Sequence, residues 1–307
     1  MSNHSLGILL ALMTWIFWSM TPFFFAATGR SIGPFATNLT RLLLASVILF
    51  VLCGLQLILF PAIPHPTTGA WMLFIGSGTV GLAVGDYFLY SSLTHVGPQR
   101  TSLLMTLSPA LTATMSWGLM RETLSPAQLT GMALVLGGVA GATWPKKESA
   151  ENSEKKTHHG MWHGAWRGLL SAFFTSISTV LARQAFLRSH DLSPLFATTI
   201  RIGSGGLTLL IFAFVTGKLV STVQKATEPA VAKRIFAGTL TGPIIGTLCY
   251  VAALKYQSAG VVTTITFMTP LLVIPVATWR YKARLSGRVL LGGASALFGV
   301  ALLGWNP

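Results

Sequence analysis

"MTLSPALTATMSW", residues 105–117, places a proline within a run of apolar and small residues, and "FMTPLLVIPVATW", residues 267–279, nearly repeats it. A proline inside a helix removes one backbone hydrogen bond, clashes with the preceding turn and costs about 3 kcal/mol. Pro109 and Pro270 each lie about ten residues into an apolar run, where each frees a carbonyl one turn earlier. Such a matched pair of kinks predicts a repeated structure in which both kinks have the same use.

The composition predicts an integral membrane protein with many spans. Of the 307 residues, 52% are hydrophobic and 9% are charged, and the mean hydropathy is +0.65, whereas soluble domains carry about 25% charged residues. Several apolar runs reach the length of about 20 residues that a helix needs to cross a bilayer. The net charge of +14 does not indicate nucleic-acid binding, because the basic residues lie mostly in short connections, where membrane proteins use them to set orientation.

Hydropathy predicts an all-α fold with ten transmembrane helices. The spans cover residues 6–27, 34–59, 70–92, 99–120, 126–144, 165–187, 194–216, 234–255, 259–280 and 286–305. One hydrophilic stretch of mixed charge, residues 145–164, is typical of a flexible linker. It divides the chain into residues 1–144, with spans one to five, and residues 165–307, with spans six to ten.

The sequences of the two halves match one another as copies of one unit. An offset of 161 residues pairs Pro109 with Pro270, and the same offset pairs glycines along spans three to five. These glycine pairs are Gly81 and Gly242, Gly85 and Gly246, Gly131 and Gly292, and Gly138 and Gly299. Nearer the start of each half the offset is 160, so that Arg41 pairs with Arg201, each seven residues after a proline. Copies of a five-span unit enter the membrane from opposite sides, so we expect two inverted five-helix repeats.

The repeats resemble those of a known transporter family. Residues 81–141 and 240–305 each combine a glycine-rich span, a run of small residues, a proline and a hinge into a second glycine-rich span, and Trp18 and Ser19 are similar to the family's first span. In these features the chain resembles the drug/metabolite transporter superfamily, as a ten-span permease with two EamA-type repeats. The resemblance implies an inner-membrane secondary transporter, often an exporter, of amino acids or related small metabolites, driven by proton exchange or by the solute gradient.

One hinge departs from the family pattern. Glu122 begins the Glu-x-x-Ser hinge of the first repeat, whereas its repeat partner is Ala283, so the chain lacks any role that needs a carboxylate at both hinges. Glu122 also lies beside Arg121 at a helix end. We therefore expect it to form an interfacial ion pair rather than to belong to a binding site.

Three ionisable residues fall within spans, where a charge is expensive and often marks function. Asp86 is the acid of span three, and it either binds a proton or a cationic group, pairs with arginine, or caps a glycine kink as a structural residue. Arg41 and Arg201 lie about 10 Å into their spans. From there they either extend back toward the membrane surface or face a cavity, where they attract a carboxylate or pair with Asp86. All three are candidates for substrate binding or coupling.

Hydroxyl and aromatic side chains complete the candidate site. Ser108 and Thr112 flank Pro109, and Thr266 carries the carbonyl that Pro270 frees. We expect the two kinks to form the wall of a cavity near the bilayer midplane; alternatively, the hydroxyls simply repair the bonds that proline breaks. The aromatic candidates are Trp15, Trp18, Tyr87, Tyr90 and Tyr250. For each aromatic residue, ordinary packing or anchoring at the membrane surface is the alternative.

The sequence predicts no cofactor, no metal site and no catalytic centre. Cys53 and Cys249 lie in apolar spans and offer neither a disulfide framework nor metal-ligand spacing. No span combines a nucleophile with a base, and none contains the filter motif or charge ring of a channel. A transporter is therefore expected, with a channel-like facilitator and a membrane-embedded enzyme as alternatives.

The basic residues also predict the orientation. Ten spans place both termini on one side, where the connections carry four basic residues, against fifteen on the side of the linker. By the positive-inside rule the linker is cytoplasmic and both termini are outside, opposite to the usual orientation of the family. The expected partners are a small-molecule substrate and the lipid bilayer, and protons and a second copy of the chain are further candidates.

Overall fold

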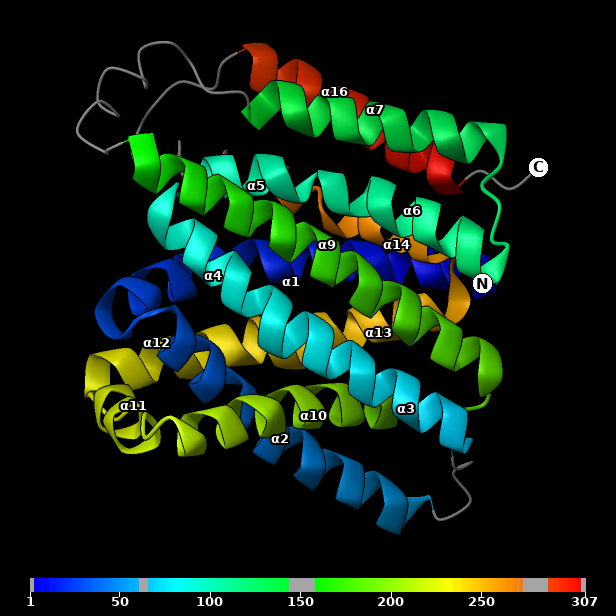
Figure 1. The fold of residues 1–307 in the computed structure, drawn as a ribbon. Coiled ribbons are helices and arrows are strands. Elements are labelled where there is room, and N and C mark those ends of the chain that lie inside the picture. The colour runs from blue at the N-terminus through cyan, green and yellow to red at the C-terminus, as the bar shows by residue number, and fades with distance from the viewer. Residues whose placement is uncertain (1–2, 61–65, 144–157, 270, 273–286, 305–307) are drawn as a thin grey trace.

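The computed structural model describes residues 3–60, 66–143, 158–269, 271–272 and 287–304. All regular structure in these ranges is helical (Figure 1). The first half comprises α1 (Asn3–Ile32), α2 (Pro34–Leu59), α3 (Thr68–Ser77), η1 (Gly78–Gly85), α4 (Asp86–His95), α5 (Pro98–Met105), α6 (Leu107–Met120) and α7 (Pro126–Thr143). The second half comprises α9 (His158–Arg188), α10 (Pro194–Val215), α11 (Leu219–Ala226), α12 (Pro229–Thr239), η2 (Leu240–Gly246), α13 (Thr247–Tyr256), α14 (Ala259–Thr266) and α16 (Gly287–Gly304).

The long helices run side by side between two ends of the molecule (Figure 1). At the linker end, which we define by the end of α7 and the start of α9, α1 is followed by α2 and α4 by α5. At the terminal end α1 begins, α16 ends and α13 is followed by α14. The pair α7 and α16 forms a layer along one edge of the bundle, and α2 lies along the opposite edge.

Seven helical segments in the described ranges are long and apolar enough to cross a membrane. They are Asn3–Thr21, Pro34–Leu59, Thr68–His95, Arg100–Met120, Trp162–Arg188, Pro194–Val215 and Pro229–Tyr256. At the predicted fifth and tenth spans the apolar segments are shorter, Pro126–Ala142 and Leu290–Leu303. The predicted ninth span, 259–280, lies partly outside the described residues. By length and composition the structure therefore supports seven of the ten predicted spans.

Helix α9 begins within the stretch 145–164 that the sequence predicts as a linker. α9 begins at His158, so the last part of the stretch 145–164 is helical rather than flexible. With 31 residues and a rise of 1.5 Å per residue, α9 is about 46 Å long, which exceeds the roughly 30 Å of the hydrocarbon core of a bilayer. Its polar first turns can therefore extend beyond the membrane as a continuous helix.

Two π-helical segments interrupt long helices at repeat-matched places. η1 joins α3 to α4, and η2 joins α12 to α13. A π-helix changes the pairing of the backbone carbonyls, and such segments occur frequently at functional sites. In η1 a glycine is required by close packing, because a Cβ on Gly81 would meet the side chain of Ser178 on α9. Each segment thus places irregular backbone in the middle of a long helix.

Helix α2 packs antiparallel to its repeat partner α10. The hydroxyl of Ser46 on α2 donates to the carbonyl of Ile202 at 3.3 Å, and that of Thr199 on α10 donates to the carbonyl of Leu49 at 3.4 Å. Residue numbers therefore rise along one helix as they fall along the other. The two helices that carry the repeat-matched arginines run in opposite directions.

Helices α7 and α16 also pack antiparallel, through close contact at glycines. Gly131 of α7 faces Gly299 of α16, and Gly138 faces Gly292; in each pair a Cβ on one residue would meet the carbonyl oxygen of the other. The hydroxyl of Ser295 adds a hydrogen bond of 3.0 Å to a carbonyl of α7. Small residues allow membrane helices to approach this closely, so the repeat-matched glycines meet across one interface.

Candidate functional site

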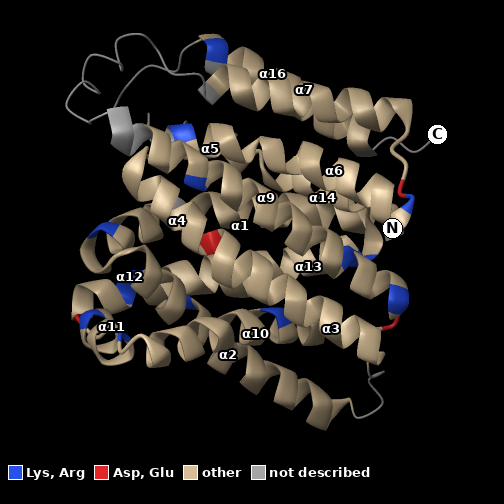
Figure 2. Ribbon diagram, in the orientation of Figure 1, with Lys and Arg blue, Asp and Glu red and all other residues tan. Residues whose placement is uncertain are grey.

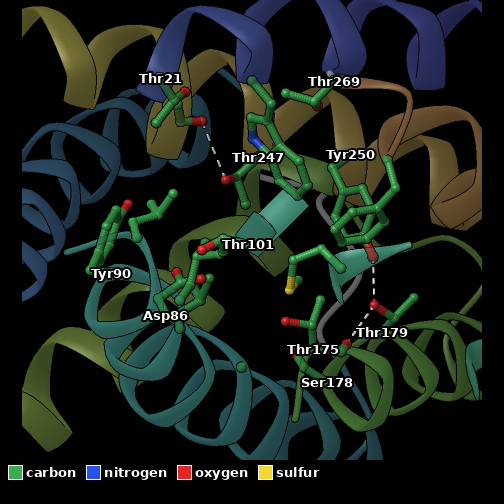
Figure 3. A pocket seen from close by; sticks show the side chains of 18 of the residues that line it. Thr21, Asp86, Tyr90, Thr101, Thr175, Ser178, Thr179, Thr247, Tyr250 and Thr269 are labelled. Atoms are coloured by element: carbon green, nitrogen blue, oxygen red, sulfur yellow. Dashed lines mark hydrogen bonds between the residues drawn. The ribbon is translucent and has the colours of Figure 1, made fainter. Parts of the chain in front are cut away.

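A cavity of about 180 Å³ lies between the two halves of the chain (Figure 3). A single water needs roughly 10–15 Å³ of such space, so the cavity is large enough for a small solute. Its lining comes from α1, α2, η1, α4 and α5 of the first half and from α9, α10, η2 and α13 of the second. Most of the side chains that line it are apolar or carry a hydroxyl, and three are charged: Arg41, Asp86 and Arg201.

The cavity brings together six residues that the sequence singled out. They are Trp18, Arg41, Asp86, Tyr90, Arg201 and Tyr250. Five other candidates are not part of its lining, namely Trp15, Tyr87, Ser108, Thr112 and Thr266. Within the described ranges, no three His, Cys, Asp or Glu side chains are grouped so that they could hold a metal ion.

The five candidates outside the lining pack or bond elsewhere. Ser108 lies 3.0 Å from a serine hydroxyl of α9, and Thr266 donates to a carbonyl of its own helix. The hydroxyl of Thr112 and the indole nitrogen of Trp15 are buried with no hydrogen-bond partner among the described residues. Tyr87 is 38% exposed. None of these positions places a polar group on the cavity wall.

The helix of the predicted fourth span breaks just before its proline. α5 ends at Met105 and α6 begins at Leu107, and Pro109 is buried in the first turn of α6. In the second half α14 ends at Thr266, the repeat partner of Met105. Pro270 lies outside the described residues. Because Met105 lines the cavity, the break in the first half lies on the cavity wall.

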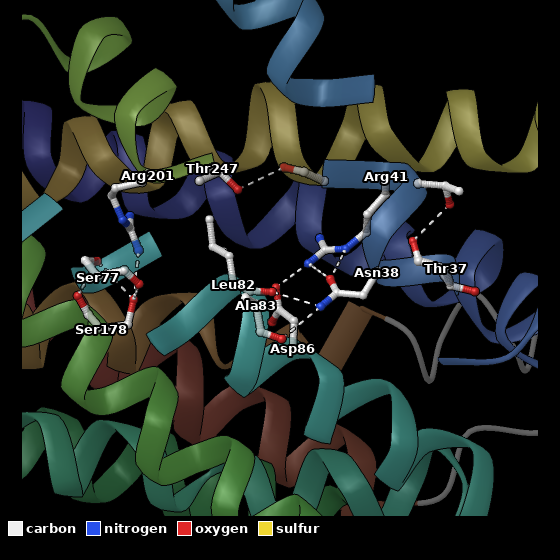
Figure 4. A network of polar contacts seen from close by, with 12 residues as sticks. Thr37, Asn38, Arg41, Ser77, Leu82, Ala83, Asp86, Ser178, Arg201 and Thr247 are labelled. Atoms are coloured by element: carbon white, nitrogen blue, oxygen red, sulfur yellow. Dashed lines mark hydrogen bonds and ion pairs between the residues drawn. The ribbon is translucent and has the colours of Figure 1, made fainter. Parts of the chain in front are cut away.

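Arg41 of α2 is buried and well bonded (Figure 4). Its guanidinium forms an ion pair with Asp86, the first residue of α4, and donates to the side-chain oxygen of Asn38 from Nε at 3.0 Å and from Nη2 at 2.8 Å. Asn38 in turn donates to the carbonyls of Leu82 and Ala83 in η1, at 2.9 and 3.2 Å. The ion pair, the amide and the π-helical carbonyls thus form one network that holds α2 against η1.

Asn38 is a site residue that the sequence patterns did not single out. It lies three residues before Arg41, a spacing that puts both on one face of a helix. The sequence signal that could have identified Asn38 was a polar residue at this spacing from Arg41 within an apolar span. Its repeat partner is Thr198, so matching residues between the two halves does not reveal it.

Two aromatic rings cover Arg41 as well. Its guanidinium carbon lies 5.0 Å from the ring centre of Tyr90 and 5.8 Å from that of Phe25. The two rings meet edge to face with their centres 5.7 Å apart. A cation held over an aromatic face gains roughly 2 kcal/mol when desolvated. Arg41 therefore has an ion-pair partner, hydrogen-bond acceptors and aromatic cover, all from the protein.

Arg201 of α10 is equally buried, with 3% exposed, but has few partners (Figure 4). Its Nη2 donates to the hydroxyl of Ser178 at 3.2 Å, and the ring centre of Tyr250 lies 5.9 Å from the guanidinium carbon. Nε and Nη1 are buried with no hydrogen-bond partner among the described residues. Thr247 occupies the repeat position of Asp86, so the duplication supplies no acid here. A charge in the middle of a membrane costs about 2.5–3.5 kcal/mol on insertion scales, so this one needs an explanation.

The neighbours of Arg201 are fixed by bonds to other groups. The hydroxyls of Ser178 and Ser77 each donate to the other residue's carbonyl at 2.7 Å. The hydroxyl of Tyr250 lies 2.5 Å from that of Thr179, and its ring centre lies 5.0 Å from that of Trp18. These side chains form an aromatic and hydroxyl wall beside Arg201 and bond to one another, while the hydroxyl of Ser178 also accepts from its guanidinium.

The two arginines lie at different levels along the bundle. Because Ser46 is bonded across to Ile202, Val47 is level with Arg201 in the antiparallel pair of helices. Val47 is six residues from Arg41, which corresponds to about 9 Å along the helix axis. Arg41 is therefore nearer the linker end, and Arg201 nearer the terminal end.

A second ion pair, at the terminal end, joins the connection between α6 and α7 to helices α9, α13 and α14. Arg183 of α9 donates from Nε to Glu122 at 2.6 Å, and from Nη1 to the carbonyls of Leu254 and Lys255 at 2.8 and 3.1 Å. The other oxygen of Glu122 accepts from the backbone N–H of Ala259 at 3.3 Å. Glu122 therefore pairs with an arginine of the other half, and not with the arginine beside it in the sequence.

Comparisons with known proteins identify the family. The model of the EamA-like transporter family matches residues 5–144 and residues 162–305. A solved structure titled "Crystal structure of protein" has a similar fold, with a TM-score of 0.70 and 18% sequence identity, over 97% of this chain and 96% of that one. No curated protein matches the chain. The chain therefore belongs to the EamA-like transporter family of the drug/metabolite transporter superfamily, and is a multi-pass membrane transporter.

Proposed function

We propose that the protein is a secondary transporter that exports a small polar metabolite, such as an amino acid or a related compound, by alternating access around the cavity between its two repeats. One observation supports this most: the lining of a cavity of about 180 Å³ between the halves contains an ion pair of the buried Arg41 with the half-buried Asp86, and a second buried arginine. Charges at that depth are costly and typically belong to a solute or ion pathway. Their place in a cavity rather than at a helix end favours a solute-binding role.

The inverted arrangement of two five-span repeats is part of the proposal. It is supported by two pairs of repeat-matched helices, α2 with α10 and α7 with α16, which each pack antiparallel. A two-fold axis in the membrane plane produces this relation, and the same device gives many carriers two equivalent orientations. The different levels of Arg41 and Arg201 fit the same scheme, since each lies toward a different end.

Irregular backbone beside the cavity offers a way for the repeats to move. η1 and η2 contribute residues to the lining, and so does Met105, which directly precedes the break between α5 and α6. Non-helical backbone at membrane depth is tolerated beside protein or a water-filled cavity, and broken helices commonly form the substrate sites of carriers. We propose that these segments act as the hinges of the transport cycle.

Counterflow in proteoliposomes tests the transport function. Vesicles that contain the protein are loaded with one metabolite at high concentration, and uptake of the same labelled metabolite from outside is followed. A carrier gives transient, saturable accumulation above that of protein-free vesicles. A flux that rises linearly with concentration identifies a channel-like facilitator instead, and conversion of the metabolite identifies an enzyme; either result contradicts the proposal.

Asp86 is the candidate for coupling to protons. Its side chain is 18% exposed and lines the cavity, so a proton that enters with water can reach its carboxylate. We expect Asp86→Asn to abolish transport driven by a pH gradient while counterflow of the solute persists. The measurement is uptake into proteoliposomes with and without an imposed gradient. If the variant keeps the pH dependence of the native protein, Asp86 has no part in coupling.

The orientation in the inner membrane follows from the charges. We propose that the linker faces the cytoplasm and that both termini are outside. The predicted spans assign fifteen basic residues to the linker side and four to the other, and in the described ranges the basic residues lie mainly toward the ends of the bundle, more of them at the linker end (Figure 2). Single cysteines at Ser2 and at Ser153, in a background without Cys53 and Cys249, test this with a membrane-impermeant thiol reagent. Labelling at Ser153 but not at Ser2 in intact cells would contradict it.

A further inference from the structure

Arg201 carries hydrogen-bond donors that the protein does not use. A guanidinium has five N–H donors and no acceptor, and those on Nε and Nη1 have no partner among the described residues. The side chain is 3% exposed and lines the cavity. Since buried polar groups are bonded in most native structures, free donors on a cavity wall point to a group that arrives from outside the chain.

The charge of the cavity leads to the same conclusion. Among the residues that line it, Arg41 and Asp86 form an ion pair and cancel each other's charge, whereas Arg201 remains. The formal charge of the lining is therefore +1. Water in the cavity can bond to the N–H groups of Arg201, but it brings no charge to balance them. A solute with a single negative charge would accept hydrogen bonds from these N–H groups and would also neutralise the net charge of the lining.

We propose that Arg201 binds an anionic group, a carboxylate or a phosphate, of the transported solute, whereas Arg41 is a structural residue held by the protein itself. The inference rests on the proposed transport function and narrows its substrate class to solutes that carry such a group. Guanidinium suits carboxylate and phosphate because its planar donors match their oxygens. The wall formed by Trp18 and Tyr250 lies beside this position and contacts the body of the solute.

An exchange experiment tests the inference and identifies the substrate at the same time. Proteoliposomes are loaded with a uniformly ¹³C-labelled metabolite extract and placed in the unlabelled extract, and the labelled compounds that leave are identified by mass spectrometry. We expect each exchanged compound to carry a carboxylate or a phosphate. Exchange of carboxylates alone or of organic phosphates alone identifies which of the two groups binds.

Three variants then locate the binding group. Arg201→Gln removes the charge, and we expect at least a tenfold rise in the KM of the exchanged anion. Arg201→Lys keeps the charge but loses the planar donors, so its KM lies between those of Arg201→Gln and the native protein. Arg188→Gln, the same substitution at an arginine that ends α9 and is not part of the cavity lining, keeps the native KM.

The possible failures are distinguishable. If neutral or purely cationic compounds exchange as readily as anions, or if Arg201→Gln leaves KM unchanged, the inference is wrong while the transport function stands. A fall in maximal rate with unchanged KM, equal in Arg201→Gln and Arg201→Lys, indicates a structural role and also overturns it. If the native protein exchanges no compound of the extract, the transport function itself is wrong, and the inference falls with it.

Discussion

The interface between α7 and α16 and the central cavity both use matching positions of the two repeats. At the interface these positions carry the same residue type, whereas several of those in the cavity carry different residues. At the interface, Gly131 and Gly138 meet the glycines that the duplication assigns to them, and both halves contribute alike. In the cavity lining, the position of Asp86 in the first repeat corresponds to Thr247 in the second, and the position of Trp18 corresponds to Ser178. Symmetry is kept where the helices pack, and it is lost at these positions of the cavity for which we propose solute binding.

The largest effect is expected at the symmetric interface. In Gly138→Leu the new side chain would displace the backbone of α16, because even a Cβ would meet the carbonyl oxygen of Gly292. We expect a loss of at least about 4 kcal/mol, as for severe overpacking, measured as loss of monodisperse protein and of the thermal unfolding transition in detergent. Gly137→Leu is the matched control, because a Cβ there meets nothing within 4 Å. Equal behaviour of the two variants would contradict the close contact.

A smaller effect is expected at the bonded arginine. Arg41→Met removes the buried partner of the half-buried Asp86, and breaking a fully buried ion pair typically costs about 3–5 kcal/mol. The thermal midpoint of the purified protein should fall accordingly. Addition of Asp86→Leu to Arg41→Met removes the orphaned charge and should restore much of the lost stability. If the double variant is no more stable than the single one, the ion pair is not the source of the loss.

The smallest effect is expected at the other arginine, and this prediction sharpens the comparison most. Arg201→Met removes a charge with no acidic partner in the described part of the chain, so its loss leaves no orphaned acid behind. The free energy of unfolding should change by no more than about 0.5 kcal/mol, so the thermal midpoint should stay close to the native value or rise. A fall as large as that of Arg41→Met would mean that both arginines are structural.

The sequence predicted the features that depend on composition and on the duplication. Apolar runs required membrane helices, and the charges within them identified Arg41, Asp86 and Arg201, because a membrane span carries such residues only at a cost. The segments of irregular backbone could not be predicted from the sequence. No local pattern distinguishes the π-helical course of η1 from an α-helix, because its carbonyls are satisfied by Asn38 of another helix. Such a segment becomes evident only when the tertiary contact is known.

The aromatic candidates show a related limit. Trp15 and Trp18 are three residues apart and share a face of α1, and both pack against the hydrophobic core, yet Trp18 also lines the cavity and Trp15 does not. Spacing gives the face of a helix, but not the level at which a hollow lies along it. The ion pair of Glu122 was hidden in the same way. Its partner Arg183 is 61 residues away in the sequence, whereas the sequence suggested the adjacent Arg121.

The cluster around Glu122 and Arg183 has a consequence for the energy of the transport cycle. The repeat positions that correspond to these two residues are occupied by Ala283 and Phe23, so the duplication does not supply the same ion pair a second time. In the proposed cycle, this ion pair would therefore stabilise the conformation that is closed at the terminal end over the one that is open there. A difference of a few kcal/mol leaves the minor conformation at roughly 0.1–10%. Between substrates, the protein would rest closed toward its termini, and each solute would first meet it from the side of the linker.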